Sequence, residues 1–337
     1  MVFTLINETE IEFRRDIKEL SELLKARITR SSQKSFECRS MDGNEFRATA
    51  LGSLLKGQDS LVVGDFILVE KIESTKEFII KELLPRTSEI FRVIVRENKK
   101  KVTAANCDHI IILNSVSKPV LKTGIIDRFL VRAFQWGIEP LVVFNKMDQY
   151  DHKKCNIQFE EERLKSLGVL CYDISALDLN YKNQYLKLGI EDLKLKLKNK
   201  TTIFLGQSGV GKSKTISRLS GGHVDLKTKK VGKGGKGSHT TTWSEIIDCQ
   251  NFDLIDSPGI RSFSVEDIDP EDLISYFPDL QAISLKCKFK NCAHDGKTPG
   301  CGFQQRNELS KPLNSRLESY KKLLEEVSET PFWSKKM

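Results

Sequence analysis

Residues 206–213 read GQSGVGKS, and this stretch decides the fold. The spacing Gly-x-x-x-x-Gly-Lys-Ser is typical of a loop that binds polyphosphates when a strand precedes it and a helix follows. The apolar run 202–205 predicts that strand. Glycines at this spacing let backbone N–H groups and a helix N-terminus face phosphate oxygens. The sequence therefore predicts an α/β domain, a parallel sheet with helices on both faces, around a nucleotide site.

The residues of this phosphate loop have distinct expected roles. Lys212 should reach the β- and γ-phosphates, and the Ser213 hydroxyl should bind Mg²⁺. The alternative is a glycine-rich turn with an exposed lysine. We assign the following residues to nucleotide binding: Gly206, Gln207, Ser208, Gly209, Val210, Gly211, Lys212, Ser213 and Lys214.

A second phosphate-side motif, DSPG at 256–259, follows the apolar run 252–255. Ligands of parallel sheets bind at the carboxyl ends of the strands, where Asp256 would lie. Its carboxylate can hold Mg²⁺ through water, so we count it with Lys212 and Ser213 as catalytic. The Gly259 N–H can bond the γ-phosphate and thereby report its presence.

The purine is expected to be guanine. Residues 145–148 read NKMD after the apolar run 141–144, and Asp148 can accept the two N–H donors on the guanine edge, which adenine lacks. Ser175 and Ala176, after the run 170–174, form a second base-side loop, where a backbone N–H can meet the guanine carbonyl. The base-side residues that we assign are Asn145, Lys146, Met147, Asp148, Ser175 and Ala176. GTP is therefore the expected substrate.

The order of these motifs is unusual. In ordinary GTPases the base motifs follow the phosphate loop, whereas here they precede it. This order indicates a circular permutation, which keeps the site because the same strand ends still meet in space. A further strand is predicted at 109–113, and helices are predicted at 125–136 and 159–167.

The N-terminal part has a different pattern. Apolar residues at helical spacing predict an amphipathic helix over 11–24. Short β-rich runs separated by glycine turns then predict a small barrel, with strands at 36–39, 45–50, 65–71 and 77–83.

Four metal-binding side chains gather near the C-terminus: Cys287, Cys292, His294 and Cys301. Three thiols and an imidazole are enough for a closed tetrahedral zinc site. We expect one structural Zn²⁺, because four protein ligands leave no open position for catalysis and the segment is too polar to form its own core. Unrelated free cysteines are the alternative. A charged helix is predicted at 314–327.

Charge and hydropathy limit the class of protein. The chain of 337 residues has 54 Lys and Arg against 46 Asp and Glu, a net charge of +8, which favours polyanionic partners. Charge alone leaves nucleic-acid binding open. No apolar run is long enough to span a membrane, and the start lacks the pattern of a signal peptide, so we expect a cytoplasmic protein.

Together these motifs resemble the circularly permuted GTPases of small ribosomal subunit biogenesis, the RsgA or YjeQ family. The resemblance rests on residues 145–148, 206–213 and 256–259, on GKGSHTTT at 235–242, and on the cysteine cluster. It implies three regions: an OB-fold barrel (31–95), a permuted GTPase (96–276) and a mostly helical zinc-binding domain (277–337). About the first 30 residues fall outside the resemblance, and we predict that they form an N-terminal helical extension (1–30).

The stretch 227–239 packs lysines among glycines and is expected to become ordered with GTP. Of the three threonines that follow, we assign Thr241 to Mg²⁺. Ile260 stands where many GTPases carry the glutamine that orients water, so intrinsic hydrolysis should be slow. The resemblance makes His239 the candidate for that role, the alternative being that it only packs or binds RNA.

The predicted function is a GTPase that assists late maturation of the small ribosomal subunit. The resemblance implies that it binds the immature subunit and its rRNA in the GTP state, as a monomer, and leaves on hydrolysis. One alternative is an RNA-binding scaffold whose site binds GTP but scarcely hydrolyses it, as Ile260 allows. Another is a GTPase that acts on a different partner, such as a translation factor.

Overall fold

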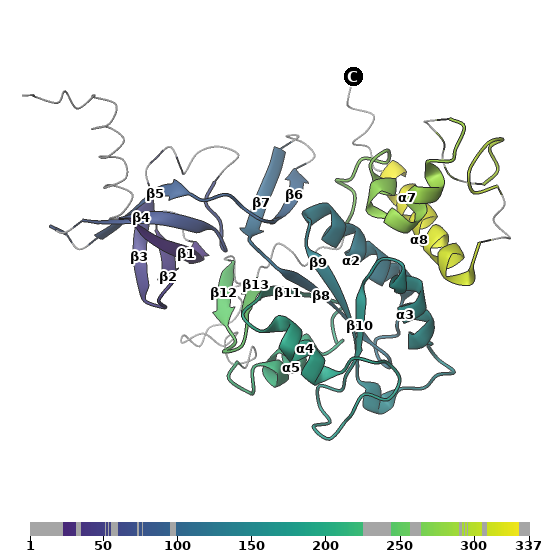
Figure 1. Ribbon diagram of the computed structural model, residues 1–337, viewed down its shortest axis with the longest axis horizontal. Coiled ribbons are helices and arrows are strands. Elements are labelled where there is room, and N and C mark those ends of the chain that lie inside the picture. Colours follow the sequence, from purple (N-terminus) through teal and green to yellow (C-terminus); the bar gives the residue numbers. More distant parts are fainter. Residues whose placement is uncertain are drawn as a thin grey trace, which may run out of the picture.

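The computed structural model describes residues 23–31, 35–50, 52, 54, 60–72, 74–75, 77–94, 99–224, 244–256, 264–289, 292, 294, 296–304 and 309–329. A barrel at one end, a central α/β unit and a C-terminal helical unit lie in a row (Figure 1). Within the described residues, none of the helices has both the length and the apolar character needed to cross a membrane.

The first unit is a closed barrel, as predicted, and it has five strands where the sequence analysis expected four. Its strands pair in the order β1-β2-β3-β5-β4, and β4 pairs back onto β1. Alternate side chains such as Ala26, Ile28, Ile67 and Val69 fill the interior. The strands are β1 (Leu24–Ser31), β2 (Phe36–Ser40), β3 (Glu45–Ala50), β4 (Phe66–Ile72) and β5 (Glu77–Leu83).

The first strand of the barrel begins before the boundary that we predicted between the extension (1–30) and the barrel (31–95). β1 begins at Leu24, so residues 24–30 belong to the barrel. The reason is local: Ala26 and Ile28 are completely buried between polar neighbours, which is the period of two of a strand. The helix predicted at 11–24 lies outside the described residues, except for its last two residues.

A hairpin that the sequence analysis missed joins the barrel to the central unit. Its strands β6 (Glu89–Ile94) and β7 (Lys99–Ala105) form a separate two-stranded antiparallel sheet. The indole Nε1 of Trp136 donates to the carbonyl oxygen of Phe91 at 3.0 Å, so the hairpin is fixed to the helix that carries Trp136.

The central unit contains the predicted sheet. Its strand order is β10-β9-β8-β11-β13-β12, in which the first five strands are parallel and β12 is antiparallel to β13. All five predicted strands are present, with ends shifted by two residues or fewer. They are β8 (His109–Ser115), β9 (Glu139–Asn145), β10 (Leu170–Asp173), β11 (Thr201–Leu205) and β13 (Asp253–Asp256), with β12 at Glu245–Asp248.

Helices cover both faces of this sheet, which confirms the predicted architecture. On one face α2 (Thr123–Trp136) and α3 (Ile157–Lys165) pack against alternate residues of β8 such as Ile110 and Ile112. On the other face α4 (Ile190–Leu197) and α5 (Lys212–Leu219) pack against Ile111 and Leu113. The strands are therefore buried on both sides, and this burial is why they read as continuous apolar runs.

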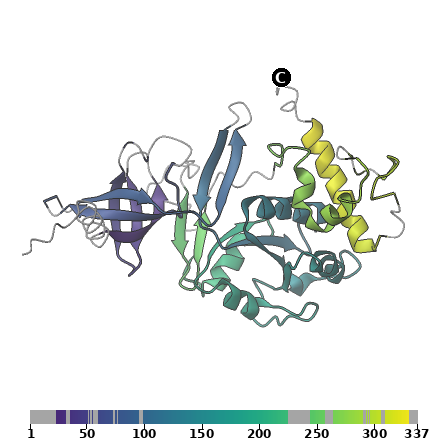
Figure 2. The ribbon, with the colours of Figure 1, turned by 45° about the horizontal axis from the view of Figure 1, so that its top comes forward.

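The C-terminal unit lies against α2 and α3, at the end of the molecule opposite to the barrel (Figure 2). It contains α7 (Pro278–Ser284) and α8 (Lys311–Glu329), which extends the predicted helix 314–327 at both ends. Val131 of α2 packs in the same apolar cluster as Leu280 of α7 and Leu317 of α8.

Two arginines of the barrel fix it to the sheet. Arg27 donates to Thr201 Oγ1 at 2.6 Å and to the carbonyl oxygen of Asn106 at 2.9 Å. Arg39 donates to Asp253 Oδ2 at 2.6 Å, and Arg27 reaches the same oxygen at 3.3 Å. The barrel is therefore anchored to the first residue of β13.

Candidate functional site

The phosphate loop has the conformation that its glycines predict. It leaves the end of β11 and enters α5 at Lys212. Gly211 has a φ of +100° and Gly209 a φ of +85°, which other L-residues rarely adopt. A Cβ atom on Gly206 would lie 2.3 Å from the carbonyl oxygen of Leu113, so this position also requires glycine for close backbone approach.

Positive charge lies inside this loop. Lys212 Nζ donates to the carbonyl oxygen of Gln207 at 3.0 Å and also to that of Gly206. The N-terminus of α5 faces the same space and adds the positive end of its dipole. Ser213 is half-buried, whereas Lys214 is exposed. The loop is therefore arranged to hold an anionic group.

Asp256 lies at the same edge of the sheet. It is the last residue of β13, which pairs in parallel with β11, so both strands end towards the phosphate loop. This position is the one predicted for a carboxylate on the metal side of a nucleotide. Gly259, His239 and Thr241 lie outside the described residues, and their roles stay predictions.

Asn145 joins the base motif to the phosphate loop and to the loop that contains Ser175 and Ala176. Its Nδ2 donates to the carbonyl oxygen of Val210 in the phosphate loop at 2.9 Å. Its Oδ1 accepts from the backbone N–H of Ala176 at 2.9 Å. Lys146 adds a further link, because its Nζ donates to the carbonyl oxygen of Gly209 at 2.8 Å. Three segments that are far apart in the sequence therefore meet at one place.

The carboxylate of Asp148, which the sequence analysis assigned to the guanine edge, is held in a defined orientation. Asp148 is exposed, and its Oδ1 accepts from the hydroxyl of the buried Ser175 at 2.5 Å. The Ser175 hydroxyl also accepts from the N–H of Asp178, which closes the turn after it. Its Oδ2 accepts from Gln149 Nε2 at 3.2 Å, and the exposed carboxylate has lone pairs left for further N–H donors.

Two of the assigned residues place their side chains in the core. Met147 is 3% exposed, and its N–H donates to the carbonyl oxygen of Ile174 at 3.1 Å. Val210 is 2% exposed and packs with the apolar cluster under α4 and α5. Any contact of these two residues with a nucleotide must therefore come from their backbone.

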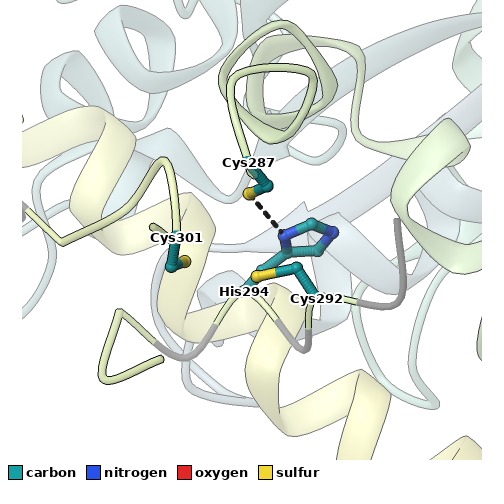
Figure 3. A group of neighbouring side chains, drawn as sticks. All are labelled: Cys287, Cys292, His294 and Cys301. Atoms are coloured by element: carbon teal, nitrogen blue, oxygen red, sulfur yellow. Dashed lines mark hydrogen bonds between the residues drawn. The ribbon is translucent and has the colours of Figure 1, made fainter. Parts of the chain in front are cut away.

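The predicted metal ligands come together in the C-terminal unit (Figure 3). One ligand atom from each of the four residues lies within 4.8 Å of all the others. Cys287 Sγ and His294 Nδ1 are 3.4 Å apart. The imidazole of His294 packs against the rings of Phe303 and Tyr320, with centroid distances of 5.6 and 6.1 Å. The α8 helix thus orients a ligand of this cluster.

The local environment affects both kinds of ligand. Burial, and after it the neighbouring thiols of Cys301 and Cys287, raises the pKa of Cys292 to about 11, so this thiol keeps its proton until a cation displaces it. Burial also lowers the pKa of His294, which favours the neutral imidazole that binds metals. The N–H groups of Gly302 and Phe303 donate to the sulfurs of Cys287 and Cys301 at 3.2 and 3.5 Å. Three thiols and one imidazole at this spacing fit a tetrahedral metal.

Comparisons with known proteins agree with this geometry. Residues 83–266 match the family model described as RsgA GTPase. The chain is 32% identical over 313 residues to the small ribosomal subunit biogenesis GTPase RsgA of Flavobacterium psychrophilum, covering 90% of this chain and 93% of that protein. It is 33% identical over 322 residues to the protein of the same name from Azobacteroides pseudotrichonymphae, covering 90% and 97%.

Two solved structures are similar over nearly their whole length. The crystal structure of YjeQ from Thermotoga maritima superposes with a TM-score of 0.70 at 25% identity, covering 91% of this chain and 99% of that one. The crystal structure of YloQ, a circularly permuted GTPase, superposes with a TM-score of 0.68 at 24% identity, covering 92% and 96%. The second likeness bears on the fold alone.

Proposed function

This chain belongs to the RsgA GTPase family and is a GTP hydrolase of ribosome biogenesis, and we propose that it binds the small ribosomal subunit with GTP in place and leaves after hydrolysis. The observation that carries the proposal is the junction made by Asn145, whose amide bonds both to the phosphate loop and to the second base loop. One nucleotide can bridge loops that are connected in this way.

Each side chain of this site has a part in the proposed mechanism. Asp148 accepts from the N1 and N2 donors of guanine and excludes adenine. Lys212 neutralises charge that develops on the β- and γ-phosphate oxygens. The Ser213 hydroxyl and the Asp256 carboxylate would hold Mg²⁺, which would offset charge on the same oxygens.

We assign the timing of release from the particle to two segments, one before β12 and one after β13. Thr241, His239 and Gly259 are proposed to respond to the γ-phosphate, with His239 positioning the attacking water in place of a glutamine. Loss of the γ-phosphate then removes these contacts, and affinity for the particle falls.

The partner and the compartment are part of the same proposal. A net charge of +8 supports binding to rRNA through phosphate contacts, by the barrel and the C-terminal unit of a monomeric, cytoplasmic protein. The cysteine cluster is proposed to hold one structural Zn²⁺, because its four ligands would complete a tetrahedron.

The test measures GTP and ATP hydrolysis by the purified protein with and without isolated small ribosomal subunits. GTP-selective turnover that rises strongly with small subunits is the expected result. GTP binding with flat turnover would favour the RNA-binding scaffold, for which Ile260 is the specific observation. Stimulation by another partner in place of the small subunit would contradict the assignment to subunit maturation.

A further inference from the structure

Arg218, in the last turn of α5, contacts the loop that follows β10. Its Nη1 donates to the carbonyl oxygen of Ser175 at 2.6 Å and also to that of Asp178. Its Nη2 donates to the carbonyl oxygen of Leu179 at 3.2 Å. All three acceptors are backbone carbonyl oxygens of one short turn, so the planar guanidinium acts as a fork that fixes the turn's shape.

The far end of the same loop is held by a carboxylate. Asp173 is 1% exposed, and its Oδ2 accepts from the N–H groups of Gln184, Tyr185 and Leu186 at 2.9 to 3.2 Å. The hydroxyl of Tyr181 donates to the same oxygen at 3.3 Å. The far half of the loop therefore has an anchor that does not depend on Arg218.

The end that Arg218 holds is the one that faces the base motif. Ser175 donates its hydroxyl to Asp148, and the N–H of Ala176 donates to Asn145. Arg218 contacts the carbonyl oxygen of Ser175 itself. Any movement of this turn therefore changes the orientation of Asp148, the carboxylate that reads guanine.

Arg218 also lies on the helix that begins at the phosphate loop. It is six residues beyond Lys212 in α5, so its contacts join the phosphate-binding element directly to the base-reading loop. A nucleoside triphosphate must fit both at once, and this helix with its arginine, together with the bonds of Asn145 to Val210 and Ala176, fixes the distance between them. The Arg218 side chain does not cap its own helix, because its three acceptors belong to another segment.

We propose that Arg218 is a positioning residue for guanine recognition, which holds Ser175 so that Asp148 keeps the orientation needed to read the purine edge. The inference rests on the proposed function, since it requires that GTP binds at this site. Arg218 would then contribute to the selection of guanine, although it lies outside the motifs at 145–148, 175–176 and 206–213.

The test compares Arg218→Ala with the wild-type protein in binding GTP and inosine triphosphate, which lacks the 2-amino group that Asp148 reads. Charge-assisted hydrogen bonds are lost, so the Kd for GTP should rise by about tenfold or more. The preference for GTP over inosine triphosphate should shrink, because a misoriented Asp148 loses its contact with the amino group. Turnover at saturating GTP should stay within about twofold, since the phosphate loop is intact.

Arg128→Ala is the matched control. Arg128 also spans two elements, by two hydrogen bonds to Glu326, but it lies on the far side of the sheet from α5. It should leave the Kd for both nucleotides unchanged. A merely structural role for Arg218 predicts lower thermal stability in the Arg218 variant with wild-type nucleotide preference, and that result would overturn the inference.

Two further outcomes are informative. If Arg218→Ala does not fold, Arg218→Lys keeps the charge without the fork and should show the same loss of preference to a smaller extent; an unchanged preference would again overturn the proposal. A wild-type protein that binds no GTP would remove the proposed function and the inference together, whereas equal binding by wild type and variant removes the inference alone.

Discussion

Replacing Arg316 by leucine should loosen the attachment of α8 to the GTPase unit. Arg316 is 1% exposed, and it donates to Asp127 of α2 and, at 2.9 and 3.2 Å, to both carboxylate oxygens of Asp279. Asp127 is itself completely buried and accepts two hydrogen bonds from Arg163 of α3, at 2.7 and 2.8 Å. The cluster therefore joins four helices through charges that water does not reach.

The expected cost follows from what the substitution leaves behind. Arg316→Leu removes the side chain that contacts both Asp127 and Asp279, and it leaves both carboxylates buried. Removing one partner of a buried ion pair costs about 3–5 kcal/mol, a large part of the roughly 5–15 kcal/mol that stabilises a domain. A loss of about 3 kcal/mol corresponds to roughly a 150-fold change in an opening equilibrium.

Amide hydrogen exchange over 311–329 measures this opening directly. Protection of α8 should fall by a factor of about 10² or more in Arg316→Leu. The matched control is Arg128→Leu on the same helix pair, whose partner Glu326 is 33% exposed at its side chain, so a change of about 0–1 kcal/mol is expected. Equal protection in the two variants would refute the view that the buried charges hold the C-terminal unit.

Three other outcomes are expected. Asp148→Asn should weaken GTP binding by at least about 100-fold while leaving folding intact, because an amide presents a donor to the guanine N–H groups. Isothermal titration calorimetry measures this affinity, and a wild-type value would contradict the assignment of Asp148. His239→Ala should abolish particle-stimulated turnover and spare GTP binding, and unchanged turnover would remove His239 from the mechanism. Cys292→Ser should lower bound zinc below one per chain, measured by elemental analysis, and reduce protection of α8, since the cluster touches Tyr320; a metal-free wild type would refute the zinc site.

The sequence predicted the central sheet well because its signals are local. Strands buried on both faces read as unbroken apolar runs, and each nucleotide motif lies at the carboxyl end of one of them, as with Asn145, the last residue of β9. The spacing of four metal-binding side chains likewise predicted a cluster whose ligand atoms lie within 4.8 Å of one another.

The elements and contacts that the sequence analysis missed also have a physical explanation. β1 was missed because its polar side chains conceal the alternation of Ala26 and Ile28, and one of them, Arg27, is buried by a partner in another unit. The hairpin of β6 and β7 was missed because Lys99, Lys100 and Lys101 hide its pairing. Tertiary contacts such as those of Arg218 and Arg316 have no local pattern at all, since their acceptors lie about 40 to 190 residues away.

The anchorage of the barrel has a consequence for how force passes through the molecule. β13 is only four residues long, with Asp253, which the two barrel arginines hold, at its start and Asp256, beside the phosphate loop, at its end. At about 3.3 Å per residue the strand spans roughly 10 Å, and an extended strand within a sheet has little room to stretch or bend. β13 thus connects the two places by one short extended segment, so we expect a displacement of Asp256 to move Asp253 and the barrel arginines that contact it.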